Sequence, residues 1–324
     1  MILVTGASGH VGGNLIRSLL KRGERVRVLV HHDRRAIEGL DVEIVQGDIL
    51  NPESLRTACE KIDVVFHAAT YISLFMHGWP RLKSINVLGT RNIVEACLDC
   101  GVRRLIHFSS IHTLVQEPLD EPIDEMRHLV ESRLYPPHDR SKAASEKEVL
   151  KGIEKGLDAI IINPTGIIGP YDFRPSHSGE ALLRMAQGNL PALIEGGFDW
   201  VDVRDVVKGT LRAEERAPTG ARYLLSGHWV SVRDMATQVE SIVGVRPPRL
   251  VLPIWIARLG APFMTAFARC TGKRPLYTAV SLKALKSNRV ISHAKATNEL
   301  KYYPRPFNDT IRDTLEWFSN NGYL

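Results

Sequence analysis

Short apolar runs alternate with longer segments of helical period along the first half of the chain. Runs rich in Val, Ile and Leu predict strands at residues 2–5, 25–30, 42–45, 63–66, 104–108 and 158–162. Between them, the spacing of apolar residues predicts helices at 11–21, 52–59, 81–100 and 140–155. Nearly continuous apolar strands are typical of a sheet that is covered on both faces. The pattern therefore predicts an α/β fold with a doubly wound parallel sheet and right-handed crossovers.

The pattern changes after Pro170, where proline and glycine become more frequent. Strands are predicted at 200–203 and 222–225, with a helix at 204–215 between them. From Ser231 onward helical periods dominate, and prolines separate them. The C-terminal third is therefore predicted to form a smaller, mostly helical lobe.

Composition favours a globular protein and excludes wholesale disorder. Of the 324 residues, 44% are hydrophobic and 24% are charged, and 42 Lys and Arg stand against 36 Asp and Glu. This basic excess is small for the length, and no stripe of basic and aromatic residues accompanies it. We therefore expect no nucleic-acid partner, whereas an anionic small ligand fits the charge balance.

Cysteine usage and the apolar stretches indicate a reducing compartment. The four cysteines, Cys59, Cys97, Cys100 and Cys270, include one C-x-x-C without a second pair, so we expect reduced thiols and no metal site. A core strand at 2–5 leaves no room for a signal peptide, and prolines and an arginine interrupt the apolar segment 250–268 too often for a membrane span. The sequence therefore predicts a cytoplasmic protein.

A glycine-rich turn follows the first strand directly. The segment Thr5-Gly6-Ala7-Ser8-Gly9-His10-Val11-Gly12 has three glycines at three-residue spacing. Such glycines allow a tight turn, a close approach of the backbone to a pyrophosphate, and close packing of the helix on the strand. The phosphates would lie at the positive end of a helix that begins near His10 or Val11. In this context the motif predicts a dinucleotide-binding site.

Further motifs follow in a recognisable order. They are Gly47-Asp48-Ile49, His67-Ala68-Ala69, Asn86-Val87-x-Gly89-Thr90, Phe108-Ser109-Ser110, Asn163-Pro164-Thr165 with Gly169-Pro170, Val201-Asp202-Val203-Arg204-Asp205-Val206 and Tyr303-Pro304-Arg305-Pro306. With these motifs the chain resembles the extended short-chain dehydrogenase/reductases of the NAD-dependent epimerase/dehydratase family. Within that family it is most similar to the branch of dihydroflavonol reductases and 3β-hydroxysteroid dehydrogenases.

The resemblance implies a Rossmann domain at 1–169, rejoined by 200–226, and a substrate-binding lobe at 170–199 and 227–324. It also implies a set of residues that contact the cofactor: Gly6, Ser8, Gly9, His10, Val11, Gly12, His31, Arg34, Arg35, Asp48, Ile49, Ala68, Ala69, Lys142, Pro164 and Thr165.

The choice between NAD and NADP depends on residues after the second strand. An acidic residue there binds the ribose 2′-hydroxyl, whereas basic residues receive a 2′-phosphate. Asp33 lies later than the usual acid, and Arg34 and Arg35 offer guanidinium groups that suit phosphate. The sequence favours NADP, with NAD as the alternative and solvated loop charges as the plainer interpretation.

The family's catalytic residues are a Ser, a Tyr and a Lys, with the last two spaced Y-x-x-x-K on one helix. Ser110 and Lys142 match the serine and the lysine, but His138 stands where the tyrosine is expected. Tyr135 lies three residues earlier, and Pro136-Pro137 argues against a shifted helical register. The resemblance implies that Ser110 positions the reacting oxygen and that Lys142 orients the nicotinamide ribose.

Three explanations for His138 stay open. His138 can replace the tyrosine as acid and base, although Lys142 and an oxidised nicotinamide would both lower its pKa. Another group, His112 or Tyr71, can supply the proton; His112 would share a face with Ser110 if the strand continued. Finally, the site can bind its cofactor without turnover.

Apolar residues gather between 250 and 277, namely Trp255, Leu259, Phe263, Met264, Phe267 and Tyr277. Their helical spacing predicts core positions more readily than a ligand wall. The resemblance implies hydride transfer to a bulky apolar substrate, whereas Arg249, Arg258, Arg269, Lys273 and Arg274 keep a nucleotide-sugar epimerase or dehydratase open. Segments 72–80 and 116–137 are expected to form further pocket walls. A membrane-docking surface at 250–274 and a homodimer are further possibilities.

Overall fold

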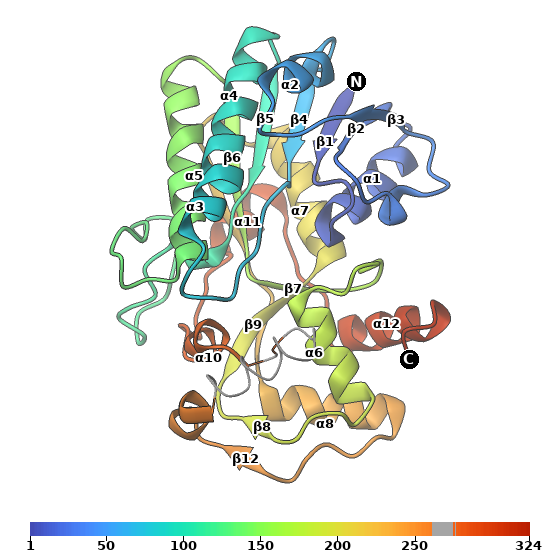
Figure 1. The fold of residues 1–324 in the computed structure, drawn as a ribbon, viewed down its shortest axis with the longest axis vertical. Coiled ribbons are helices and arrows are strands. Elements are labelled where there is room, and N and C mark those ends of the chain that lie inside the picture. Colours follow the sequence, from blue (N-terminus) through green and yellow to red (C-terminus); the bar gives the residue numbers. More distant parts are fainter. Residues whose placement is uncertain (261–274, 276) are drawn as a thin grey trace.

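A computed structural model describes residues 1–260, 275 and 277–324. Its main sheet has seven parallel strands in the order β10-β6-β5-β4-β1-β2-β3 (Figure 1). The strands are β1 (Ile2–Thr5), β2 (Val26–Val30), β3 (Glu43–Gln46), β4 (Val64–His67), β5 (Arg104–Phe108), β6 (Ala159–Pro164) and β10 (Arg222–Leu225). The predicted doubly wound parallel sheet is therefore confirmed. Its strand order reverses between β1 and β4, where ligands of such sheets bind.

Helices cover both faces of this sheet. One face carries α1 (His10–Lys21), α7 (Val203–Arg216) and α11 (Ala294–Leu300), and the other carries α2 (Pro52–Cys59), α4 (Gly89–Asp99) and α5 (Pro137–Glu154). Alternate residues of β1 point to opposite faces of the sheet. Val4 packs with the first set of helices and Leu3 with the second. Covering on both faces explains the nearly continuous apolar strands of the sequence.

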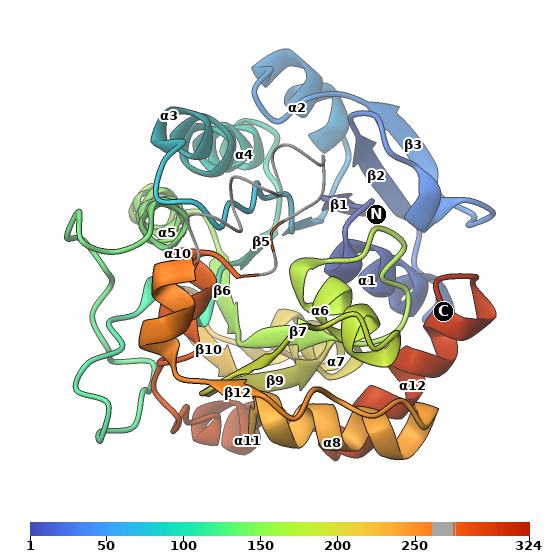
Figure 2. The same ribbon diagram turned by 60° about the horizontal axis from the view of Figure 1, so that its bottom comes forward.

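The smaller lobe lies below the carboxyl ends of the main strands in Figure 1. It contains a three-stranded sheet in the order β11-β9-β7 and a two-stranded pair β12-β8. Its strands are β7 (Gly166–Ile168), β8 (Leu193–Ile194), β9 (Gly197–Asp202), β11 (His228–Ser231) and β12 (Val251–Leu252). Its helices include α6 (His177–Ala186), α8 (Val232–Val243), α10 (Ala279–Ala284) and α12 (Phe307–Asn320), and α8 lies beside α12 in Figure 2. This lobe closes over the end of the main sheet that the glycine-rich turn occupies.

Three predicted elements differ in the structure. The strand expected at 200–203 is β9, and it pairs with β7 and β11 in the lobe instead of joining the main sheet. The helix expected at 81–100 is built from α3 (Trp79–Leu82), a π-helical segment η2 (Lys83–Leu88) and α4. Helix α5 begins at Pro137, three residues earlier than expected, because proline fits the first position of a helix.

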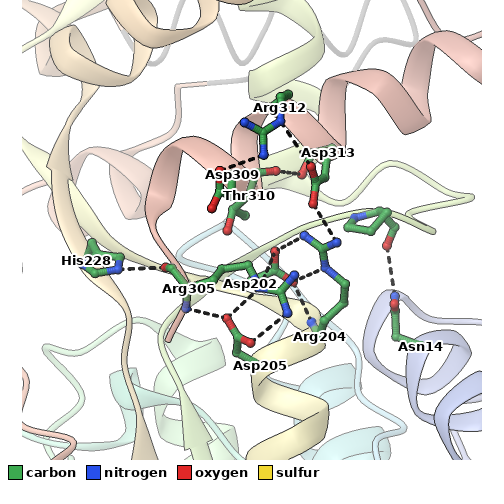
Figure 3. A network of polar contacts seen from close by, with 12 residues as sticks. Asn14, Asp202, Arg204, Asp205, His228, Arg305, Asp309, Thr310, Arg312 and Asp313 are labelled. Atoms are coloured by element: carbon green, nitrogen blue, oxygen red, sulfur yellow. Dashed lines mark hydrogen bonds and ion pairs between the residues drawn. The ribbon is translucent and has the colours of Figure 1, made fainter. Parts of the chain in front are cut away.

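The two late sequence motifs meet in one polar network, drawn in Figure 3. Asp202, at the end of β9, accepts hydrogen bonds from Arg204 and lies 3.5 Å from the Arg305 guanidinium. Arg305 also forms an ion pair with Asp205 at 2.9 Å, and Arg204 forms one with Asp313 on α12 at 2.8 Å. The network therefore fixes β9, α7 and α12 against each other.

Two further observations bear on the protein's surroundings. None of the helices that the structure describes is long and apolar enough to cross a membrane. Cys59, Cys97 and Cys100 are free thiols, and Cys270 lies outside the described residues.

Candidate functional site

The glycine-rich turn holds α1 against the end of β1 at distances that exclude side chains. Gly6 has φ +72°, and a Cβ there would lie 2.5 Å from the backbone of Ala68. A Cβ on Gly12 would lie 2.2 Å from the carbonyl oxygen of Gly6. Helix α1 begins at His10, with no side chain capping its first turn. Free backbone N–H groups at this end, and a cradle that a Cβ would fill, fit a pyrophosphate.

The same turn is bonded to the lobe. The carbonyl oxygen of Pro170 lies 3.0 Å from His10 Nε2 and accepts a hydrogen bond from Asn14 Nδ2 at 3.0 Å. Figure 3 shows the Asn14 contact. The segment that enters the lobe is therefore fixed to the first turns of α1.

Asp48 and His31 lie at the outer end of the dinucleotide site. His31 Nε2 is 3.9 Å from Asp48 Oδ2, and both residues line the cavity described below. A Cβ on Gly89 would lie 2.7 Å from the Ile49 side chain, so the glycine of the N-V-x-G motif makes room for Ile49.

The two candidate phosphate ligands are engaged elsewhere in this structure. Arg35 is exposed and forms a two-pronged pair with Asp33, with Nη2–Oδ2 at 2.6 Å. Arg34 donates to Gln46 Oε1 at 3.0 Å. Neither arginine is among the described residues that line the cavity, so their contact with a 2′-phosphate stays a prediction.

A single cavity of about 1410 Å³ runs from the glycine-rich turn to the lobe. It brings together most of the residues that the sequence assigned to cofactor and catalysis: Gly6, Ser8, Gly9, His10, Val11, Gly12, His31, Asp48, Ile49, Ala68, Ala69, Ser110, His138, Lys142, Pro164 and Thr165. Residues 72–75, 116–117, 119 and 135–136 also line it, so the two expected wall segments face the cavity.

Ser110 lies two residues beyond β5 and lines the cavity. The chain turns there into a 3-10 segment, η3 (Ile111–Thr113), so the strand does not continue to His112 as expected. Ser110 Oγ accepts a hydrogen bond from the backbone N–H of His112 at 3.2 Å. This bond leaves the serine hydroxyl hydrogen available to a bound oxygen.

His138 and Lys142 lie one turn apart on α5 and face the cavity together. Lys142 Nζ donates to the carbonyl oxygen of Phe108 at 2.5 Å, and burial lowers the pKa of this lysine to about 8. Burial, with the charge of Lys142 as a smaller cause, lowers the pKa of His138 to about 3. Within the described part of the chain His138 Nδ1 is buried without a hydrogen-bond partner. A neutral imidazole therefore lines the site, with one ring nitrogen buried and unpartnered.

The other residues that could donate a proton also line the cavity. Tyr135 precedes α5, and its hydroxyl donates to Glu117 Oε2 at 3.2 Å. Tyr71 lines the cavity with its ring 4.5 Å from the Arg81 guanidinium carbon. His112 also lines it, and burial lowers its pKa to about 4.

Two carboxyl groups on α5 were not identified from the sequence. Glu146 is fully buried, where it accepts hydrogen bonds from Ser109, Thr113 and Asn163 and pairs with Arg222 at 2.5 Å. Its position four residues after Lys142 is a usable signal, because that spacing repeats one helical face. Asp139 lines the cavity beside His138. No local pattern reveals it, since distant segments create its surroundings.

The lobe side differs from the expectation of an apolar core. Trp255 and Leu259 are 65% and 68% exposed, so they are not core residues. Phe263, Met264, Phe267, Arg269, Lys273 and Arg274 lie outside the described residues. Tyr277 and Arg258 line the cavity, together with Phe198, Trp200, Met185 and Met235. The lobe therefore presents a mainly apolar wall with isolated basic groups.

Comparison with known proteins agrees with this geometry. Residues 2–225 match the model of the NAD dependent epimerase/dehydratase family. The chain is 34% identical to sterol demethylase protein B of Methylococcus capsulatus, over 99% of each chain. It is 31% identical to a putative dihydroflavonol 4-reductase of Synechocystis, over 99% of this chain and 95% of that one. The crystal structure of gox2253 superposes with a TM-score of 0.87 at 36% identity, over 100% and 99% of the two chains.

Proposed function

The chain belongs to the NAD dependent epimerase/dehydratase family, and on that premise we propose that it is an NADP(H)-dependent oxidoreductase. Its substrate is a bulky apolar molecule that carries a secondary alcohol or a ketone. The observation that carries this proposal is the continuous cavity, which joins the glycine-rich turn, Ser110, His138 and Lys142 to apolar walls of the lobe. The names of two similar proteins refer to a sterol and a dihydroflavonol, which are bulky ring systems.

The cofactor site is built mainly from backbone. The amides of the turn at Gly6–Gly12 hold the pyrophosphate, and Lys142 holds the nicotinamide ribose. NADP is favoured because Arg34 and Arg35 stand at the end of β2, and NAD is the alternative. When bound, the nicotinamide supplies or accepts a hydride.

The protein's own side chains position the reacting oxygen. Ser110 donates its hydroxyl hydrogen to that oxygen, since its Oγ already accepts from His112 N. His138 lines the cavity, and its neutral imidazole accepts a hydrogen bond from a substrate hydroxyl. Because burial lowers its pKa to about 3, His138 takes up a proton poorly at neutral pH, so it positions the hydroxyl without carrying its proton.

The first test measures binding and substrate class. Quenching or enhancement of NADPH fluorescence gives the dissociation constant, and NADH is titrated in parallel. The protein is then assayed with multi-ring ketones and alcohols and with nucleotide sugars. Turnover of the apolar ketones supports the proposal. Turnover of nucleotide sugars alone makes it an epimerase or dehydratase, for which Arg258 and Arg174 line the cavity. NADPH binding without any turnover makes it a cofactor-binding protein.

The second test restores the family's usual residue. His138→Tyr places a phenol four residues before Lys142, so we expect ketone reduction to rise while NADPH binding persists. His138→Gln is the matched control, since it keeps a polar side chain that cannot be protonated. If reduction stays absent in His138→Tyr while NADPH still binds, the missing phenol is not the main determinant of activity.

A further inference from the structure

Asp139, the residue after His138, faces the cavity and has no role in the chemistry described above. It belongs to the first turn of α5 and lines the same cavity as Ser110, His138 and Lys142. Within the part of the chain that the structure describes, its carboxyl group has no hydrogen bond and no ion pair within 4.0 Å. A carboxyl group in such a place either binds a ligand or moves a proton.

Two charged groups of the cavity wall both contact Tyr135. Glu117 accepts the hydroxyl hydrogen of Tyr135, and the Lys283 ammonium on α10 lies 4.7 Å from the centre of the Tyr135 ring. Burial raises the pKa of Asp139 to about 7, and the charge of Lys283 opposes this. The same cavity is lined by titratable groups from its own helix, from η3, from the 116–136 segment, from α10 and from the 71–82 segment: His138, Lys142, His112, Glu117, Tyr135, Lys283, Tyr71 and Arg81.

The two adjacent residues have opposite properties. With a pKa of about 3, His138 holds a proton at pH 7 in only about one molecule in ten thousand. A carboxyl group whose pKa is about 7 is half protonated there, which is the condition that suits a general acid and base. The carboxyl group of Asp139 therefore offers a proton source in the cavity that His138 also lines.

We propose that Asp139 is the general acid and base of this site, and that its carboxyl group exchanges the proton of the reacting hydroxyl beside His138. The proposal rests on the oxidoreductase function above. In reduction, the carbonyl carbon gains a hydride as the C4–H bond of the dihydronicotinamide breaks, and the π pair of the C=O bond moves onto oxygen. The O–H bond of Asp139 then breaks and its proton, passed through a cavity water, forms the alcohol O–H bond. The carboxylate left behind is reprotonated from solvent.

The test compares Asp139→Asn with a matched carboxyl outside the cavity. Glu125→Gln is the control, because burial also raises the pKa of Glu125 but this residue does not line the cavity. In the wild-type protein, kcat/KM for reduction should fall tenfold per pH unit above about pH 7, and kcat/KM for oxidation should fall likewise below it. Asp139→Asn should remove the pH dependence in both directions and lower kcat/KM for reduction and for oxidation by about a hundredfold at pH 7. The fold decrease must be the same in both directions, because the reaction equilibrium is unchanged. Glu125→Gln should keep both limbs.

A second measurement requires no turnover. Infrared difference spectra of the protein without cofactor, taken between pH 5 and pH 9, should show a protonated carboxyl band that disappears near pH 7 and that Asp139→Asn lacks. If no such band is lost in Asp139→Asn, or if the variant keeps the pH limbs and changes only KM, the proposal is wrong and Asp139 merely recognises substrate. If the band is present but no ketone or alcohol is turned over, the oxidoreductase function itself fails, and the role of Asp139 fails with it.

Discussion

The two ends of the cavity are built from different parts of the chain. At the dinucleotide end, Gly6 and Gly12 bring backbone against backbone, and the helix start offers main-chain N–H groups. At the α5 end, the chemistry depends on buried titratable side chains, of which His138 and Asp139 have pKa values moved in opposite directions. A backbone site tolerates changes of side chain but not an added Cβ. A side-chain site changes its chemistry with one residue, which is why the family's tyrosine can be absent here while the turn is intact.

Acid should have the largest effect, because it must protonate buried histidines of the main sheet and of the α5 end. Burial lowers the pKa of His67 to about 3, of His112 to about 4 and of His138 to about 3, and it lowers the pKa of His107 well below its usual value. The unfolded chain binds these protons below about pH 6.5, whereas the folded protein does not, so stability that is complete above this pH is lost as pH falls toward 4. The loss approaches about 1.4 kcal/mol per histidine per pH unit, or about 5 kcal/mol per pH unit for all four.

Urea unfolding at pH 7, 6 and 5 measures this slope. His67→Asn should reduce it by about a quarter, taking the four histidines as equal contributors. His32→Gln is the control, because His32 is exposed near the dinucleotide end. A slope unaffected by His67→Asn would contradict this account.

An added methyl group should disrupt the dinucleotide end. In Gly12→Ala the new Cβ would lie 2.2 Å from the Gly6 carbonyl oxygen, so the turn must open. We expect NADPH binding to weaken about a hundredfold, which corresponds to about 3 kcal/mol. Fluorescence titration measures it. Gly23→Ala meets no atom within 4 Å and should leave binding unchanged, and equal affinity of both variants would refute the backbone-built site.

Substitutions in the polar network that joins β9, α7 and α12 should have a smaller effect on stability, because its members share partners. Arg305→Met leaves Asp202 paired with Arg204 but leaves Asp205, among the described residues, only the backbone N–H of residue 305, so we expect a loss of about 2 kcal/mol in unfolding free energy. Arg312→Met removes an exposed pair with Asp309 in the same view and should cost under about 0.5 kcal/mol (Figure 3). Chemical denaturation measures the unfolding free energy of both variants. Equal losses would show that the buried network stabilises the protein no more than the exposed pair does.

The smallest expected effect concerns cofactor choice. Asp33→Asn frees the Arg35 guanidinium, so NADPH should bind about two- to threefold more tightly while NADH binding stays constant. Asp41→Asn, at another exposed acid nearby, is the control. If both dinucleotides gain equally in Asp33→Asn, Arg35 does not contact a 2′-phosphate.

The sequence predicts the backbone-built features well and the tertiary ones poorly. Strand runs and the glycine-rich turn follow from local constraints, Ser110 and Lys142 follow from the resemblance to the family, and the structure brings the turn and both residues to one cavity. The start of α5 was misplaced because Pro137 reads as a helix breaker, although it occupies the first helical position.

Burial, in contrast, depends on segments far apart in the chain. The pKa of Asp139 depends on burial and on the charge of Lys283 from α10, and Glu146 is bonded by Asn163 and Arg222. Trp255 and Leu259 show the opposite case, since apolar residues at helical spacing are exposed. Periodicity identifies a face but not what packs on it.

The carbonyl oxygen of Pro170 connects the lobe to helix α1. Both His10 and Asn14 contact this one oxygen, so the chain that enters the lobe cannot swing outward without releasing two bonds at the start of α1. For the proposed oxidoreductase, we therefore expect the release of the dinucleotide and the release of product to depend on the same two bonds.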